Sequence, residues 1–195
     1  MKLTLSIKYF FDTFLSLFLL IFLGWLILLC LILASVDTLS FGLFVQKRVG
    51  QYGKLFNIFK IRTINDKTGH ISRFGMFLRK SKIDELPQLV NVFFGQMSFV
   101  GPRPDIPGYY DKLEGDNRKI LELKPGLTSE ASLKYFNEEH ILSTKANPLE
   151  YNDSVIFPDK LKMNLEYYYK KSFTEDLKII FKTVSKFFMK SSPKL

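Results

Sequence analysis

The sequence predicts a mainly helical α+β protein with one N-terminal membrane segment and one compact domain after it. Residues 13–36 form an uncharged apolar run of 24 residues, and a spanning helix needs about 20. Short β-prone stretches punctuated by glycine follow the run, and helical periodicity dominates the remainder. The 195 residues suffice for one domain and an anchor but are few for two full domains.

Composition and charge narrow the class of protein. Hydrophobic residues make up 47% of the chain, which excludes a disordered composition. The 28 Lys and Arg against 19 Asp and Glu give a net charge of +9. This excess indicates an anionic partner, which is a nucleic acid, a membrane phospholipid or a phosphorylated substrate. The single cysteine, Cys30, excludes an internal disulfide, and the absence of a Cys/His cluster argues against structural zinc.

The flanks of the apolar run bear on its topology. Positive charge marks the cytoplasmic side of a membrane segment, and both flanks are basic. One solution is a re-entrant helical hairpin broken near Gly24, and the other is a single span with a tolerated glycine. A cleaved signal peptide fits poorly, because the run is too long and residues 34–36 make a poor cleavage site. The flanking cations are Lys2, Lys8, Lys47, Arg48, Lys54, Lys60 and Arg62.

Several elements are expected after the run. Phe44-Val45 and Phe56 to Ile61 are β-prone, and Gly50 to Gly53 between them predicts a hairpin turn. Residues 73–82 predict a basic helix whose apolar residues either rest on a membrane or face a core. A short helix is expected from Asp84 to Phe94 with Pro87 in its first turn, and a strand at 97–100.

The C-terminal third is expected to contain helices and loops. Residues 105–122 and 161–171 look helical, whereas 124–129 and 146–159 look like loops. A final helix capped by Thr174 is expected to carry an apolar stripe and a separate lysine stripe. This pattern suits a helix on an anionic membrane surface, or a helix of a globular protein whose lysines face water. Its apolar stripe comprises Leu177, Ile180, Phe181, Val184, Phe187 and Phe188.

Asp84 and Glu85 are the candidate catalytic pair. Adjacent carboxylates at a helix start have an ordinary structural explanation. Aspartate is a good N-cap, and glutamate in the first turn complements the helix dipole. The chemical alternative is that a helix N-terminus and the nearby cations keep Asp84 ionised, so that it can attack phosphorus. Glu85 would then offer an oxygen ligand to Mg²⁺.

Cations near this pair are candidates for binding a diphosphate, and ordinary surface charge is the alternative. The chain lacks the glycine-rich loops that bind ATP or dinucleotides and the GxSxG motif of hydrolases. The candidate cations are Lys60, Arg62, Arg79, Lys80 and Arg103.

Taken together, the motifs resemble the small monotopic phosphoglycosyl transferases, the bacterial initiating sugar transferases. The resemblance runs from Lys8 to about Thr183. The segments that carry it are QKRVGQYGKLFNIFKIRT, LRKSKIDELPQLVNVFFGQMSFVGPRP, KPGLT and LEYYYKKSFTEDLKIIFKT. DELPQL followed closely by MSFVGPRP is the most specific part.

The resemblance implies a function and a site. Such enzymes move a sugar phosphate from a UDP-sugar to undecaprenyl phosphate or another polyprenyl phosphate and release UMP, with Mg²⁺. It implies that Asp84 is the nucleophile of a covalent intermediate and that Glu85 helps bind the metal. It further implies phosphate or nucleotide contacts from Arg79 and Arg103. Lys60 and Arg62 are candidates for the same role because they are among the cations near the carboxylate pair.

The resemblance also implies a location and a fold. The expected fold class is α+β, mainly helical, with an N-terminal re-entrant membrane helix and a compact catalytic domain with amphipathic interfacial helices. The expected domains are 1–40 and 41–195. The catalytic domain would face the cytoplasm at the bacterial inner membrane, among its phospholipids. Relatives usually carry Ser-Pro at the hairpin break, whereas this chain has Leu23-Gly24-Trp25, so a spanning topology stays open.

Two other functions are compatible with parts of the sequence. A membrane-tethered nucleic-acid binder would account for the charge, but no nucleic-acid motif is present, and no nucleic-acid partner is expected. A non-catalytic scaffold is opposed by the retention of Asp84, Glu85 and Arg79. The sugar, the pathway and the oligomeric state are not predicted by the sequence.

Overall fold

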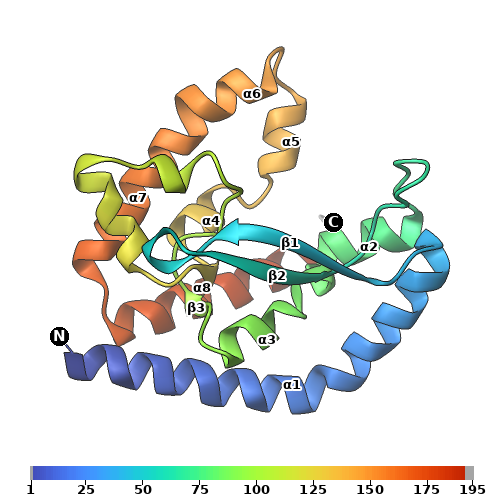
Figure 1. Cartoon of the computed structure of the whole chain (residues 1–195), viewed down its shortest axis with the longest axis horizontal. Coiled ribbons are helices and arrows are strands. Elements are labelled where there is room, and N and C mark those ends of the chain that lie inside the picture. Colours follow the sequence, from blue (N-terminus) through green and yellow to red (C-terminus); the bar gives the residue numbers. More distant parts are fainter. Residues whose placement is uncertain (1, 192–195) are drawn as a thin grey trace. The chain divides into compact units, whose positions relative to one another are not determined.

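The computed structural model describes residues 2–191 (Figure 1). The chain divides into two compact units. The Asp84 unit comprises residues 8–48 and 55–97. The Arg103 unit comprises residues 49–54 and 98–191 together with the start of the chain. These units do not follow the expected ranges 1–40 and 41–195, and the division at residue 40 stays a prediction.

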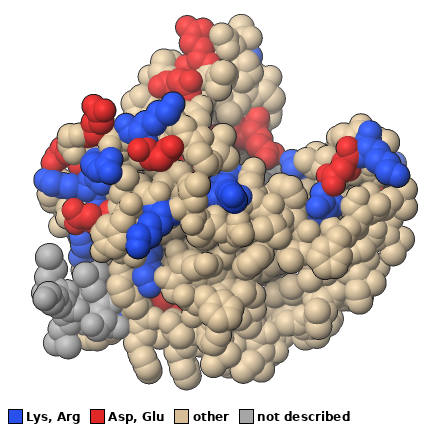
Figure 2. Space-filling model, in the orientation of Figure 1, with Lys and Arg blue, Asp and Glu red and all other residues tan. Residues whose placement is uncertain are grey.

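Helix α1 (Lys2–Thr38) is the long apolar element expected from the sequence. Its stretch Ile7–Thr38 has a mean hydropathy of 3.1 and is long and apolar enough to cross a membrane. The ribbon bends along its length (Figure 1), although the helix continues through Gly24. One face is buried at Cys30 and Ala34, and the opposite face exposes large apolar side chains. On the face shown in Figure 2, the surface over the C-terminal part of α1 lacks charged side chains.

The expected β-hairpin is confirmed. Strands β1 (Leu43–Val49) and β2 (Leu55–Ile61) form a two-stranded sheet. The 3-10 turn η1 (Gln51–Gly53) joins them, with Tyr52 at φ 59° and Gly53 at φ 74°. A connection this short permits only antiparallel strands. Ile61 of β2 packs with the buried face of α1, which places β2 against that helix.

Helix α2 (Arg73–Ser81) is confirmed, and its apolar residues divide between a buried face and an exposed one. Leu78 is fully buried in the core with Cys30, Ala34 and Ile61, and Phe74 packs against that core. Met76 and Phe77 are exposed instead. The helix therefore contributes to a core on one side and presents an apolar surface on the other.

The expected helix from Asp84 to Phe94 is wrong in its first half. Residues Ile83–Glu85 form a 3-10 turn, η2, and helix α3 covers only Gln88–Phe93. The reason lies at Lys82, which ends α2 in the left-handed conformation at φ 59° and turns the chain sharply. Asp84 is thus a buried turn residue and caps no helix.

In the Arg103 unit, strand β3 (Ser98–Val100) pairs in parallel with β4 (Gly126–Thr128). The strand β3 was expected, whereas the segment 124–129 was expected to be a loop. Glycines allow the close approach, because a Cβ on Gly126 would overlap the backbone of Gly101. The Gly101 N–H donates to Thr128 O (3.0 Å), and the Gly126 N–H donates to Pro102 O (2.9 Å). The GPRP and KPGLT segments are therefore interlocked.

The rest of the Arg103 unit is mostly helical. Residues 105–122 hold two 3-10 segments, so the helical expectation there was only partly right. The expected loop at 146–159 is wrong, because Pro148 and Pro158 each lie at a helix start, where proline is tolerated. The elements are η3 (Tyr110–Lys112), η4 (Gly115–Glu122), α4 (Glu130–Lys134), α5 (Glu138–Ser143), α6 (Pro148–Tyr151), the π-helix η5 (Asn152–Ile156), α7 (Phe157–Lys170) and α8 (Phe173–Ser191).

The last helix, α8, is confirmed with a different cap. Ser172 Oγ accepts from the Glu175 N–H at 3.2 Å, so Ser172 and not Thr174 takes that position. Ile179 is buried, whereas Leu177, Phe181 and Val184 are exposed. Phe187 and Phe188 lie outside the residues whose side chains the structure describes. The exposed stripe agrees with an amphipathic helix.

Candidate active site

Asp84 is a buried carboxylate that the fold leaves partly unsatisfied. Its relative exposure is 8%, and its Oδ1 has no hydrogen-bond partner among the described residues. A buried polar atom without a partner costs about 1–3 kcal/mol, and more when it is charged. Such an atom in a native fold points to a ligand, a metal or a catalytic role.

Burial sets the acidity of this carboxyl. Desolvation, followed by the charge of Glu85, raises the pKa of Asp84 from 3.8 to about 6. Lys60, Lys82 and Arg79 act in the opposite direction. The sequence-based expectation was that the cations and a helix N-terminus would dominate, and burial proves stronger. Asp84 is nevertheless largely ionised at neutral pH, and its carboxylate is poorly solvated.

A pH-dependent stability follows from this shift. The pKa of Asp84 is higher in the folded state than in the unfolded state. The buried carboxyl therefore causes no loss of stability below about pH 4, where it is protonated, and the protein loses stability as the pH rises through about 6. Asp84→Asn removes the buried charge, so we expect it to be about 2 kcal/mol more stable than the wild type at pH 8, with little difference at pH 4. Thermal unfolding in detergent with a chelator measures this. A less stable variant at pH 8 would contradict it.

Glu85 points its carboxylate at cations. Lys60 Nζ lies 3.2 Å from Glu85 Oε1, and Lys82 Nζ lies 4.0 Å from the same atom. The side chains of Lys60 and Glu85 are 18% and 13% exposed, so the pair is largely shielded from water. Lys60 comes from β2, and Glu85 follows Asp84 in η2. The structure therefore brings three of the expected site residues together.

Arg79 and Arg62 belong to the same unit but are held differently. Arg79 Nε donates to Thr63 Oγ1 at 2.9 Å, and its charge reaches Asp84. Arg62 Nε donates to Phe41 O at 2.9 Å, and Arg62 forms an ion pair with Asp66. Arg62 thus ties neighbouring loops together, and its role as a phosphate contact stays a prediction.

Sequence reasoning missed Asn91, which connects helix α3 to strand β2. Its Nδ2 donates to Asn57 O (2.7 Å), and its Oδ1 accepts from the Phe59 N–H (3.3 Å). The amide of a fully buried α3 residue thereby holds the strand that carries Lys60. In the helix expected from the sequence, Asn91 lies on the side opposite the apolar residues Leu89, Val90 and Phe93, so no sequence signal marked it.

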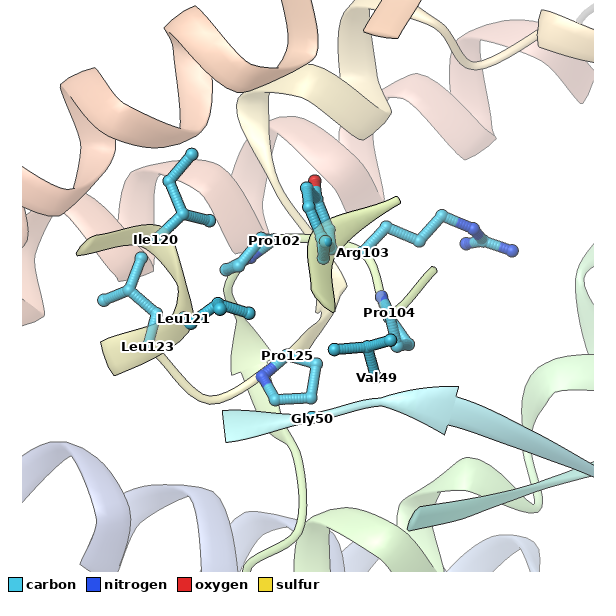
Figure 3. Close-up of a pocket in the computed structure, with 10 residues that line it drawn as sticks. Val49, Gly50, Pro102, Arg103, Pro104, Ile120, Leu121, Leu123 and Pro125 are labelled. Carbon is cyan, nitrogen blue, oxygen red and sulfur yellow. The ribbon is translucent and has the colours of Figure 1, made fainter. Parts of the chain in front are cut away.

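Arg103 belongs to the other unit. It lines a small, mostly apolar pocket with Val49, Tyr110 and the flanking prolines (Figure 3). Its side chain extends away from the apolar lining, and the residue is exposed (Figure 3). The interlocked GPRP and KPGLT segments fix its backbone. Its role as a phosphate contact stays a prediction.

The donor chemistry near Asp84 fits a magnesium ion. Mg²⁺ is typically held by one or two carboxylates together with substrate phosphates. Asp84 and Glu85 supply the two carboxylates, and the unpartnered Oδ1 of Asp84 is an available oxygen. No group of three or more His, Cys, Asp or Glu residues suited to a metal occurs within residues 2–191.

Comparisons with known proteins bear on this arrangement. The profile of the bacterial sugar transferase family matches residues 3–190. A putative undecaprenyl-phosphate N-acetylgalactosaminyl 1-phosphate transferase of Bacillus subtilis is 37% identical over 97 residues, covering 44% of this chain and 54% of the relative. A UDP-glucose:undecaprenyl-phosphate glucose-1-phosphate transferase of Escherichia coli is 32% identical over 182 residues, covering 83% of this chain and 36% of the relative.

A third relative matches over more of its own length. The exopolysaccharide production protein PSS of Rhizobium leguminosarum bv. phaseoli is 30% identical over 199 residues, covering 92% of this chain and 94% of the relative. By contrast, the chain spans only about half of the Bacillus relative and about a third of the Escherichia relative. Because the family profile covers nearly all of its residues, the chain belongs to the bacterial sugar transferase family.

Proposed function

We propose that this protein is a phosphoglycosyl transferase that moves a sugar phosphate from a UDP-sugar to undecaprenyl phosphate or a related polyprenyl phosphate and releases UMP. The reaction would be the first membrane step in building a bacterial glycoconjugate. The buried Asp84 carboxylate, with an unpartnered oxygen beside Glu85 and Lys60, carries the proposal. Family membership and the names of the relatives support the substrate classes.

The proposed reaction has two displacements. A carboxylate oxygen of Asp84 attacks the β-phosphorus of the UDP-sugar, and the bond from that phosphorus to the bridging oxygen breaks, so that UMP leaves. An oxygen of the lipid phosphate then attacks the same phosphorus and restores the Asp84 carboxylate. Poor solvation makes the carboxylate a better nucleophile, because less water must be displaced before attack.

The residues around Asp84 would bind and neutralise the donor diphosphate. Asp84 and Glu85 are the carboxylates that would hold Mg²⁺, which when bound supplies charge neutralisation for the diphosphate. Lys60 orients Glu85 through their 3.2 Å contact. Arg79 supplies a planar guanidinium suited to phosphate oxygens, and Arg103 is proposed as a further phosphate or nucleotide contact.

The inner membrane is the proposed location, with the catalytic residues on the cytoplasmic side. The exposed apolar faces of α1, α2 and α8 support contact with membrane phospholipid. Both flanks of α1 are basic, which supports a re-entrant helix. We expect reporters fused at Met1 and at Leu195 both to be cytoplasmic. A periplasmic N-terminal reporter would establish a true span and rule out the re-entrant topology.

The activity test is release of UMP from a panel of UDP-hexoses and UDP-N-acetylhexosamines. The purified protein is supplied with undecaprenyl phosphate and Mg²⁺ in detergent. At least one donor should give UMP and a lipid diphosphate sugar in equal amounts. If no donor gives UMP, or if the lipid product contains one phosphate rather than two, the proposal fails.

A further inference from the structure

Arg79 is hydrogen-bonded to the side chain of Thr63, which lies two residues after the end of β2. Its Nε donates to Thr63 Oγ1 at 2.9 Å, and Thr63 is only 6% exposed. A guanidinium has five N–H donors in one plane, of which the Nε–H is one. Holding that N–H restricts the orientation of the guanidinium plane and therefore the directions in which the Nη donors can point. The hydroxyl of Thr63 thus controls how Arg79 can meet a phosphate.

Helix α2 lies very close to the backbone of Thr63 at Gly75. Gly75 precedes Arg79 by four residues on α2, so both lie on one helix face. A Cβ on Gly75 would come within 2.6 Å of Thr63 O, so α2 rests directly on the backbone of Thr63. This contact brings the next turn of the helix, which carries Arg79, within reach of the Thr63 hydroxyl.

The start of α2 is anchored as well. Ser72 Oγ accepts from the Gly75 N–H at 2.9 Å and donates to Asp37 Oδ2 at 2.6 Å. The helix is thereby tied to the end of α1 at its first turn and to Thr63 at its middle. With the helix fixed at both points, the hydrogen bond to the Thr63 hydroxyl restricts rotation of the Arg79 side chain.

We propose that Thr63 is a positioning residue for sugar-phosphate transfer, which orients the Arg79 guanidinium toward the donor diphosphate beside Asp84. The inference rests on the proposed function. Thr63 does not itself touch the reacting atoms. Its contribution requires the hydroxyl and not the methyl group, because the contact with Arg79 is a hydrogen bond to Oγ1.

Two substitutions separate the hydroxyl from the packing. Thr63→Val keeps the shape and removes the acceptor, whereas Thr63→Ser keeps the acceptor and removes a methyl group. Loss of a hydrogen bond to a charged group predicts a fall in kcat of about ten- to a hundredfold for Thr63→Val. Thr63→Ser should remain within about threefold of the wild type. Steady-state UMP release and thermal unfolding are measured for each purified full-length variant.

A double-mutant cycle with Arg79→Ala distinguishes positioning from general destabilisation. If Thr63 acts through Arg79, Thr63→Val causes no further loss of kcat in the Arg79→Ala background. Equal losses in both backgrounds, or equal turnover of Thr63→Val and Thr63→Ser, overturn the inference. If Thr63→Val does not fold, Thr63→Ala takes its place in the same comparison with Thr63→Ser.

The outcomes also separate this inference from the proposed function. A wild-type protein that releases no UMP overturns the proposed function and the role of Thr63 with it. A wild type that turns over, an Arg79→Ala variant that is impaired and a Thr63→Val variant that matches Thr63→Ser overturn only the role of Thr63.

Discussion

Asp84→Asn should lower UMP release by at least about 10³-fold, because an amide cannot displace UMP from phosphorus. The change keeps the size of the side chain. It also removes the destabilising buried charge of the Asp84 carboxyl, whose pKa is raised to about 6. The variant should therefore be folded, more stable at neutral pH and inactive. Loss of activity with a gain of stability is the signature of a residue retained for chemistry.

Asp116→Asn is the matched control for this variant. Asp116 is an exposed aspartate in η4 that pairs with Lys119 at 2.6 Å. The same chemical change there removes one surface charge, which usually alters stability by less than about 0.5 kcal/mol. Turnover of Asp116→Asn should match the wild type. Comparable turnover of Asp84→Asn and Asp116→Asn would remove Asp84 from the mechanism.

Gly126→Ala should destabilise the protein by about 3 kcal/mol or more. The added Cβ would overlap the backbone of Gly101, which cannot move without breaking the bonds between the GPRP and KPGLT segments. Because Arg103 lies two residues after Gly101, its placement should suffer along with the pairing of β3 and β4. Chemical unfolding of the purified variant measures the loss of stability.

Gly24→Ala serves as the control for a glycine without neighbours. A Cβ at Gly24 would meet nothing within 4 Å, and the residue lies inside a continuous helix. Alanine is favoured over glycine in a helix by about 1 kcal/mol. Gly24→Ala should therefore be neutral or stabilising. If Gly126→Ala unfolds at the same denaturant concentration as Gly24→Ala, the interlocked segments are not a structural requirement.

The elements that the sequence predicted well are those decided by local pattern. The apolar run of α1 and the Gly50–Gly53 turn needed no tertiary information. The failures came from backbone geometry and distant partners. Nothing in the periodicity of residues 84–94 shows that Lys82 adopts a left-handed conformation and pulls Asp84 out of the helix. Likewise, KPGLT becomes a strand only because β3 lies beside it.

The candidate site shows the same division. Asp84, Glu85, Lys60 and Arg79 could be named from residue type and motif, and the structure places them in one unit. The dominance of burial over the surrounding cations could not be predicted, because desolvation depends on the packed fold. Thr63 contacts Arg79 through one hydrogen bond and Asn91 contacts β2 through two, and a sequence pattern does not reveal such contacts between distant residues.

The most direct test of the central claim is to trap the phosphosugar on the protein. The wild type is incubated with Mg²⁺ and a UDP-sugar labelled in its β-phosphate, without a lipid acceptor. The account predicts labelled protein with the label on Asp84, release of one UMP for each label, and loss of the label to lipid when undecaprenyl phosphate is added. A protein that turns over with lipid acceptor but never carries label, or a label that persists in Asp84→Asn, would contradict it.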